Sequence, residues 1–357
     1  MNTSLEDDTP GICDHSIDRS SENGDFHPDD SLNGDNSENV KKSGCVCIPL
    51  AHLLKMSIPE AESILEPLIT KQTVAMVYAW RGIGKSWFAM ALACAVAFGM
   101  QFLKWKSSKK WRVLYIDGEL PARVLQDRMR LIVNGFDGDI DHDSLHFITP
   151  DLQENGVMPN LSDPIGQAII DEIAQGFDLI IVDNLSTLAR SGKENEGESW
   201  LPIQGWALRH RAQGRAILFV HHSGKGGQQR GASRREDILD VVITLKRPPE
   251  YQSSDGAHFE VIFEKARHLS GDDAASLDVR LSIDEDKVHW DWKPAENTLI
   301  DRIELLIEEG ATREEILVET GISSRFTLRR LVSAANENRE KKIILPDSRK
   351  LKKPGGG

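Results

Sequence analysis

The chain has 357 residues, of which 39% are hydrophobic and 28% charged, and its formal net charge is −13. This is enough for a sizeable core in about two domains. The acidic balance excludes a general binder of polyanions, so any contact with nucleic acid needs a local basic patch.

The four cysteines are too few for a disulfide framework in a chain of this length. Cys45 and Cys47 lack a second ligand pair that would complete a metal site. The N-terminus shows no signal-peptide pattern, and the longest apolar run, 88–100, is too short to span a bilayer. We therefore expect reduced thiols in a cytoplasmic protein without a membrane partner.

Residues 1–44 are rich in Asp, Glu, Asn, Ser and Gly and contain few large apolar side chains. Such a segment cannot bury enough surface to offset the entropy of ordering, so we predict a disordered acidic tail. The tail either solvates the protein or covers a basic surface until nucleic acid displaces it. Residues 347–357 are also predicted to be disordered.

Strands and helices alternate over residues 45–293, which we predict to form one domain. Two short amphipathic helices, at 49–54 and 61–69, are expected to lead into it. Five strands are expected next, at 73–78, 112–116, 145–148, 178–182 and 216–220. Four helices are expected between them, at 85–100, 121–133, 164–175 and 199–213. Because the strands are mostly continuous apolar runs separated by helical lengths, we predict an α/β fold with a mainly parallel sheet covered on both faces. Further strands at 241–246, 258–265, 276–282 and 287–292 are expected to add antiparallel edge strands.

Pro294 marks a predicted boundary, and residues 294–346 are expected to form a small helix-turn-helix or winged-helix unit. A first helix is predicted at 299–308, ended by Gly310. Thr312-Arg-Glu-Glu315 is a capping box that opens a second helix, and a third, at 325–336, is capped by Ser323 or Ser324. A wing strand is expected at 342–345. The third helix carries Arg325, Thr327, Arg329 and Arg330, which suit contact with duplex DNA or a protein partner.

The stretch Ala79-Trp-Arg-Gly-Ile-Gly-Lys-Ser86 follows a predicted strand and precedes a predicted helix. In a phosphate-binding loop, consecutive backbone N–H groups surround the phosphates at a helix N-terminus. Glycine is needed where the backbone meets phosphate, at Gly82 and Gly84, whereas a methyl group at Ala79 is tolerable if φ is negative. Lys85 is expected to reach the β and γ phosphates, and Ser86 to bind Mg²⁺. The residues expected to contact the nucleotide are Arg81, Gly82, Ile83, Gly84, Lys85, Ser86 and Trp87.

Two further strand ends carry carboxylates. The run Phe177–Asp183 ends in Asp183, which is expected beside Mg²⁺ unless it only caps a helix. Asn184 follows, and a carboxamide cannot act as a base. The base is therefore expected from another strand, at Glu119, with Asp117 as the second choice. Alternatively, Glu119 only begins a helix.

The strand at 216–220 runs into Val-His221-His222-Ser-Gly-Lys225. Either histidine is placed to sense the γ-phosphate and pass the signal to the loop that follows. A histidine pair at a strand end is equally often a hydrogen-bonded core pair. The residues alone leave both interpretations open.

Together these motifs resemble the RecA-like ATPases over residues 65–290. The similarity is strongest to the RepA-type hexameric plasmid replicative helicase group, which is related to DnaB-like and KaiC-like ATPases. The motifs concerned are Ala79–Ser86, Asp117–Pro121, Ile180–Asp183, Val220–Lys225, Gln229–Ser233 and Glu264–His268. The resemblance implies a RecA-like P-loop core, Mg²⁺-dependent ATP hydrolysis, Glu119 as the base and His222 as the γ-phosphate sensor.

The same resemblance implies sites shared between subunits of a hexameric ring. It assigns Arg230, Lys265 and Arg267 as cations supplied by the neighbouring subunit, although Arg230 would alternatively contact DNA phosphate. A trans arginine stabilises the charge on the transferring phosphoryl group. The basic loop around it would face single-stranded DNA in the channel through Lys225, Arg234 and Arg235.

Two functions remain open from sequence. The first is an ATP-hydrolysing motor, a ring-forming DNA helicase or replication ATPase of a plasmid, phage or mobile element. The second is an ATP-switched DNA-binding or regulatory protein that assembles on DNA without unwinding it. The departures from the family, which are Ala79, the acidic tail and the C-terminal unit, bear on this choice.

Overall fold

The computed structural model describes residues 46–190, 200–223, 236–248, 251–308, 310–337, 339 and 342–346. The chain divides into two units, Met1–Pro59 and Glu60–Gly357. In the first unit, α1 (Leu50–Leu53) confirms the short helix predicted at 49–54. Several predictions lie outside the described residues: the acidic tail 1–44, Cys45, Lys225, Arg230, Arg234, Arg235 and the end 347–357.

The second predicted helix, at 61–69, is wrong. The segment is a hairpin of β1 (Ser63–Leu65) and β2 (Ile69–Thr70). A surface helix leaves one face in water, whereas the large apolar side chains of this segment are all buried, and Pro67 lacks the N–H that a helix interior needs. The buried side chains are Ile64, Leu65, Leu68 and Ile69.

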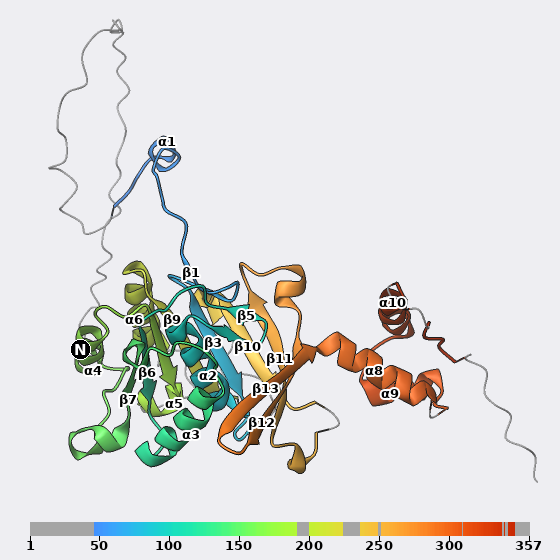
Figure 1. Ribbon diagram of the computed structural model, residues 1–357. Helices are drawn as coiled ribbons and strands as arrows, with labels where there is room; N and C mark the ends of the chain where they lie inside the picture. The colour runs from blue at the N-terminus through green and yellow to red at the C-terminus, as the bar shows by residue number, and fades with distance from the viewer. Residues whose placement is uncertain are drawn as a thin grey trace, which may run out of the picture. The chain divides into compact units, whose positions relative to one another are not determined.

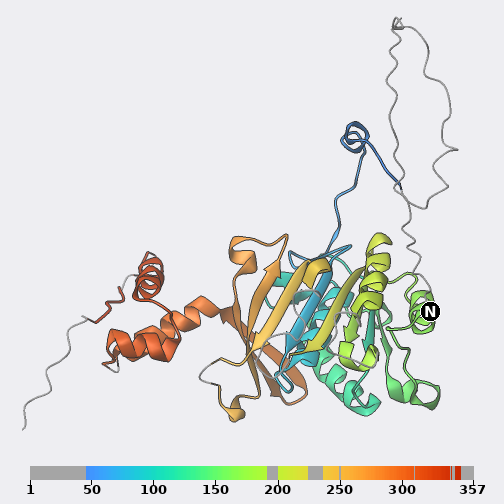
Figure 2. The ribbon, with the colours of Figure 1, turned by 180° about the vertical axis from the view of Figure 1, so that it is seen from behind.

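The second unit contains a nine-stranded sheet in the order β13-β12-β11-β10-β3-β9-β8-β6-β7 (Figures 1 and 2). The strands from β10 to β7 run parallel, and β11, β12 and β13 add antiparallel pairs at one edge. This confirms the predicted α/β class with a mainly parallel sheet and antiparallel edge strands. The bounds are β3 (Val74–Ala79), β6 (Val113–Asp117), β7 (Leu145–Ile148), β8 (Leu179–Asp183), β9 (Ala216–His222), β10 (Val241–Lys246), β11 (Ala257–Ala266), β12 (Leu277–Asp284) and β13 (Lys287–Pro294). A separate small hairpin joins β4 (Gln101–Phe102) and β5 (Trp105–Lys106).

The direction of β10 differs from the prediction. The strand has the predicted bounds, but it pairs parallel with β3 and antiparallel only with β11. An apolar pattern predicts that a strand exists, whereas its direction depends on the path of the preceding connection. As a result, β3 has a parallel neighbour on each side.

Helices cover both faces of the sheet (Figure 1). On one face lie α2 (Lys85–Phe98) and α3 (Ala122–Asn134), and on the other α4 (Pro164–Ile173), α5 (Leu185–Leu188) and α6 (Leu201–Ala212). Alternate residues of β3 enter the two cores, with Val77 in the first and Met76 in the second. Helix α2 is buried along nearly its whole length, as expected for a helix that is apolar on all sides. The phosphate-loop helix is therefore held rigidly.

Three helices follow the sheet: α8 (Ala295–Glu308), α9 (Arg313–Thr320) and α10 (Arg325–Ala335). The capping box at Thr312 is formed, and Ser324 is the cap of α10. The helices share a small core, which includes Ile303, Ile316 and Leu328. The first helix starts earlier than predicted, directly after β13. The wing strand predicted at 342–345 is not formed, because Ile343 bonds to the Asn336 side chain and not to a strand.

No helix in the described part of the chain is long and apolar enough to cross a membrane.

Candidate functional site

The loop between β3 and α2 lies at the carboxyl end of the parallel strands. Ala79 is the last residue of β3 and is not among the residues with positive φ, so its methyl group fits as the sequence predicts. Gly82 has φ 77° and Gly84 has φ 125°. These values are strained for other residues, and they turn the loop into the first turn of α2.

The two glycines differ in their surroundings. A Cβ on Gly82 would meet no atom within 4 Å, whereas a Cβ on Gly84 would approach Cε1 of Phe259 to 3.0 Å. Gly82 therefore faces open space, which suits a phosphate. Gly84 also allows the loop to pack on β11, a contact that the sequence does not reveal.

We expect Gly84→Ala to lower the free energy of unfolding by about 1–3 kcal/mol, because alanine is strained at this φ and its methyl group would displace Phe259. Nucleotide binding should weaken as the loop shifts. Thermal denaturation with and without nucleotide measures both effects. Gly205→Ala is the control, since Gly205 lies inside α6 and a Cβ there would come no closer than 4.0 Å to the Arg209 side chain. A Gly84→Ala protein as stable as the parent would contradict this account.

The side chain of Lys85 is folded back onto the loop. Its Nζ donates to the carbonyl oxygens of Ala79 and Trp80, at 3.1 Å each. Burial lowers the pKa of Lys85 to about 8, although the Asp183 and Glu119 carboxylates act in the opposite direction. An anion bound here would favour the charged ammonium. Among the residues that the structure describes, this buried cation donates to two neutral carbonyls.

Asp183 ends β8 and is buried. Its Oδ2 accepts a 2.7 Å hydrogen bond from the Tyr115 hydroxyl on β6, and its carboxylate also accepts from the Ser86 hydroxyl. Burial raises the pKa of Asp183, while these two hydrogen bonds and Lys85 lower it. The sequence predicts that Ser86 and Asp183 both lie at a Mg²⁺ site. It does not predict their neighbour Tyr115.

Asp117 is the last residue of β6, and Glu119 lies in the turn that follows it. Oδ1 of Asp117 accepts from the backbone N–H groups of Glu119 at 2.8 Å and Leu120 at 2.7 Å. Burial raises the pKa of Asp117 to about 6. Asp117 therefore fixes the turn, and Glu119 projects from it with 57% of its side chain exposed. Of the two carboxylates, Glu119 is the one that water can reach.

Asn184 joins this turn to the end of β9. Its Nδ2 donates to Oε2 of Glu119 and lies 3.2 Å from Nε2 of His222. His222 Nε2 is also 3.6 Å from Oε2 of Glu119. Burial lowers the pKa of His222, and so does Lys85. His221 faces away, with Nδ1 3.5 Å from the Ser186 hydroxyl. Only His222 belongs to the site, which the sequence alone could not decide.

These side chains line one cavity of about 410 Å³. Ile83 is not among the lining residues, because its side chain enters the core. The sequence missed Arg128 of α3, whose guanidinium lies 5.1 Å from the ring centroid of Trp87. No local motif marks Arg128, since only the packing of α3 brings it here. The lining is Arg81, Gly82, Gly84, Lys85, Ser86, Trp87, Asp117, Glu119, Leu120, Arg128, Asp183, Asn184, His222, Gly256 and Ala257.

The structure does not bring Lys265 and Arg267 to this cavity. Lys265 pairs with Val242 near the amino end of β10. The guanidinium of Arg267 is 3.4 Å from Oδ1 of Asp240 and donates to the Asp237 carbonyl at 2.8 Å. The two cations thus lie at the opposite end of the sheet from the phosphate loop. Lys265 and Arg267 are therefore too far from the phosphate loop of their own chain to act at its site.

The cavity fits a nucleotide with Mg²⁺. Gly82 leaves open space over the loop, and Lys85 offers a buried cation whose acceptors among the described residues are two neutral carbonyls. Ser86 and the buried Asp183 supply oxygen atoms, the ligands that Mg²⁺ prefers when phosphate and water complete its shell. No group of three or more His, Cys, Asp or Glu side chains able to hold a metal ion occurs among the described residues.

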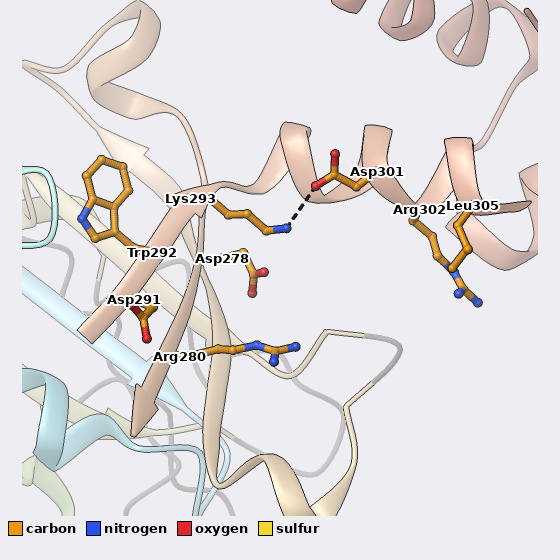
Figure 3. A pocket seen from close by; sticks show the side chains of 8 residues that line it. All are labelled: Asp278, Arg280, Asp291, Trp292, Lys293, Asp301, Arg302 and Leu305. Atoms are coloured by element: carbon orange, nitrogen blue, oxygen red, sulfur yellow. Dashed lines mark hydrogen bonds and ion pairs between the residues drawn. The ribbon is translucent and has the colours of Figure 1, made fainter. Parts of the chain in front are cut away.

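A second pocket, of about 370 Å³, lies where β12 and β13 meet the start of α8 (Figure 3). Lys293 donates to Asp301 there at 3.1 Å. Its charged side chains include both acids and bases in similar number, so it does not select one class of ligand. It shares no lining residue with the phosphate-loop cavity. The lining is Asp278, Arg280, Asp291, Trp292, Lys293, Asp301, Arg302 and Leu305.

Comparison with known proteins gives similarities of two kinds, to a sequence family and to solved structures. The sequence model of the family described as "AAA domain" matches residues 47–228. Solved structures similar to this chain include a KaiC-like protein from the hyperthermophilic archaeon Pyrococcus horikoshii OT3, with 13% identity, a TM-score of 0.43, and coverage of 64% of this chain and 93% of that one.

Proposed function

Because the chain belongs to the AAA domain family, we propose that it binds ATP with Mg²⁺ and hydrolyses it as a ring-forming motor on DNA. The observation that carries the proposal is the shared cavity. It gathers the phosphate loop, Asp183, Glu119 and His222 from four neighbouring strand ends. These are a phosphate cradle, a metal ligand, a base and a polar sensor.

Each side chain has a role that its surroundings support. Lys85 leaves the carbonyls of Ala79 and Trp80 to bind the β and γ phosphates. Ser86 and Asp183 hold Mg²⁺, which would neutralise charge on the phosphates. Glu119, exposed to the cavity, orients a water molecule and takes its proton as the water oxygen bonds to the γ phosphorus and the bond to the bridging oxygen breaks. His222 reports the γ-phosphate to the segment after Ser223.

The trans cations are part of the same proposal. Lys265 and Arg267 lie far from their own phosphate loop, as expected for groups that complete a neighbour's site. In that role Arg267 has to leave Asp240 and the Asp237 carbonyl. Hydrolysis would then depend on assembly, because a lone subunit lacks charge stabilisation at the γ-phosphate. Arg230 is proposed for the same role.

A second candidate function is an ATP-switched DNA-binding protein that does not unwind. The observation in its favour is α10, where Phe326, Arg329, Arg330 and Ser333 share one exposed face at helical spacing. Neither Arg329 nor Arg330 has an ion-pair partner among the described residues. In a helix-turn-helix unit such a face suits duplex DNA. We propose the domain limits 45–293 and 294–346, and a cytoplasmic location, for either function.

We expect single-stranded DNA and ATP together to shift the protein from monomers to a ring, most simply a hexamer, and to raise ATP hydrolysis. Sedimentation with and without ATP and DNA measures assembly. A strand-displacement assay then separates the candidates: unwinding supports the motor, and ATP-dependent duplex binding without unwinding supports the switch. Monomers that hydrolyse ATP at the full rate would refute the trans cations.

A further inference from the structure

Asn184 lies between two of the candidate functional side chains, Glu119 and His222. It is 1% exposed and stands between the end of β8 and α5. A carboxamide cannot act as a base, so the sequence alone gives Asn184 no role in the reaction. In the structure its carboxamide contacts the candidate base on one strand end and the candidate sensor on another.

The orientation of the carboxamide is fixed by its surroundings. Oδ1 of Asn184 caps α5 by accepting from the Thr187 N–H at 3.2 Å. The opposite orientation would place Oδ1 against the Glu119 carboxylate and Nδ2 against the Thr187 N–H, which leaves both pairs unmatched. The amide nitrogen must therefore face Glu119 and His222.

The backbone around Asn184 is also held. The Asp183 carbonyl accepts from the Gly118 N–H at 2.7 Å, which ties β8 to the turn that carries Glu119. The Asn184 carbonyl accepts from the Thr187 hydroxyl at 3.0 Å. The donor is thus placed by backbone bonds on both sides, whereas the side chain of Glu119 is mostly exposed. Asn184 is held in place by its own surroundings. The side chain of Glu119 would be free to move if its contact with Asn184 were lost.

We propose that Asn184 is a positioning residue, whose amide N–H groups hold the Glu119 carboxylate and, in the tautomer that leaves Nε2 unprotonated, the His222 imidazole in one fixed arrangement at the γ-phosphate end of the cavity. The proposal rests on the proposed ATPase function. The base then keeps one oxygen on Asn184 and presents the other to water. Without the contact Glu119 samples many rotamers, and fewer of its encounters with water are productive.

Two substitutions separate positioning from helix capping. Asn184→Asp keeps an acceptor for the Thr187 N–H and nearly the same shape, but it replaces the donor that faces Glu119. Asn184→Ser also caps a helix and removes the donor without adding charge. If Asn184 only caps α5, both variants retain hydrolysis. If it positions Glu119, both lower kcat by about tenfold to a hundredfold, while nucleotide affinity stays close to the parent value and Asn184→Ser melts close to the parent temperature.

Asn160→Asp is the matched control. Oδ1 of Asn160 accepts from the Ser162 and Arg190 N–H groups outside the cavity, so the variant adds the same charge and keeps the same acceptor. It should hydrolyse ATP normally. Full kcat in both Asn184 variants would overturn the proposal. If Asn184→Asp does not fold, Asn184→Ser alone decides.

Exchanging the hydrogen-bond donor and acceptor between Asn184 and Glu119 provides a test by melting temperature, which does not depend on activity. Asn184→Asp places two carboxylates together and should lower the melting temperature below that of Asn184→Ser. Adding Glu119→Gln restores a hydrogen bond with donor and acceptor exchanged, and should recover the loss. No recovery would mean that the contact does not form in solution. Loss of function in Asn184 variants counts only if Lys85→Ala also abolishes hydrolysis. If Lys85→Ala remains active, the ATPase assignment itself fails.

Discussion

Replacing Lys85 with alanine is expected to reduce ATP hydrolysis by about 100- to 1000-fold, the effect of removing one preorganised charge from a transition state. The ammonium is buried, and in the described part of the chain its acceptors are two neutral carbonyls. Burial already lowers its pKa to about 8, which means that the fold gains little from the cation. We therefore expect the variant to fold, to melt near the parent temperature and to bind ATP weakly. Steady-state hydrolysis and nucleotide titration measure the two effects.

Lys104→Ala is the matched control for this experiment. Its Nζ also donates to two backbone carbonyls, those of Asp272 and Ala275, and burial also lowers its pKa. It lies outside the phosphate-loop cavity. The control should keep its activity. Hydrolysis that survives Lys85→Ala would refute the site under either candidate function.

Glu119→Gln is expected to lower kcat by about 100- to 10,000-fold, the range for a lost general base. Glutamine has the same shape, and its Oε1 can still accept from Asn184, so nucleotide binding should persist. ATP affinity measured together with single-turnover hydrolysis separates binding from chemistry. The variant should hold ATP without cleaving it.

Asp117→Asn tests the alternative base. Asp117 bonds to two backbone N–H groups of the turn, so its loss should disturb the position of Glu119 more moderately. Severe loss in Asp117→Asn with an active Glu119→Gln would reverse the assignment. Glu172→Gln, on the exposed side of α4, controls for removal of one negative charge.

Predictions from the sequence are correct where they depend on residues that are close together along the chain. Gly82 and Gly84 indicate positive φ. Their spacing from Lys85 and Ser86 is typical of a loop that joins a strand to a helix. Asp183 ends a continuous apolar run. Such patterns report the backbone conformation of the residues that carry them, and this is why the strand bounds of the sheet were predicted closely. The family match confirms the resemblance to P-loop ATPases.

Predictions from local patterns are wrong where the structure depends on residues that lie far apart in the sequence. The hairpin at 61–69 is predicted as a helix because its apolar residues, Ile64, Leu65, Leu68 and Ile69, recur at helical spacing, and its strand pairing is visible only in the tertiary structure. The direction of β10 depends on the path of the connection before it. The wing strand is absent because Ile343 bonds to the side chain of Asn336. The catalytic assignments of Glu119, His222, Arg230, Lys265 and Arg267 remain predictions.

By itself, the sequence determined that a phosphate loop follows a buried strand and that carboxylates end two others, because residue order fixes these relations along the chain. Only the tertiary structure decided which side chains meet. Asn184 reaches both Glu119 and His222 because β8 lies between β6 and β9. Arg128 enters the cavity because α3 packs beside α2, and Lys265 and Arg267 are carried to the far end because β11 runs antiparallel to β10. Strand order and direction are properties of the whole sheet, and no segment encodes them alone.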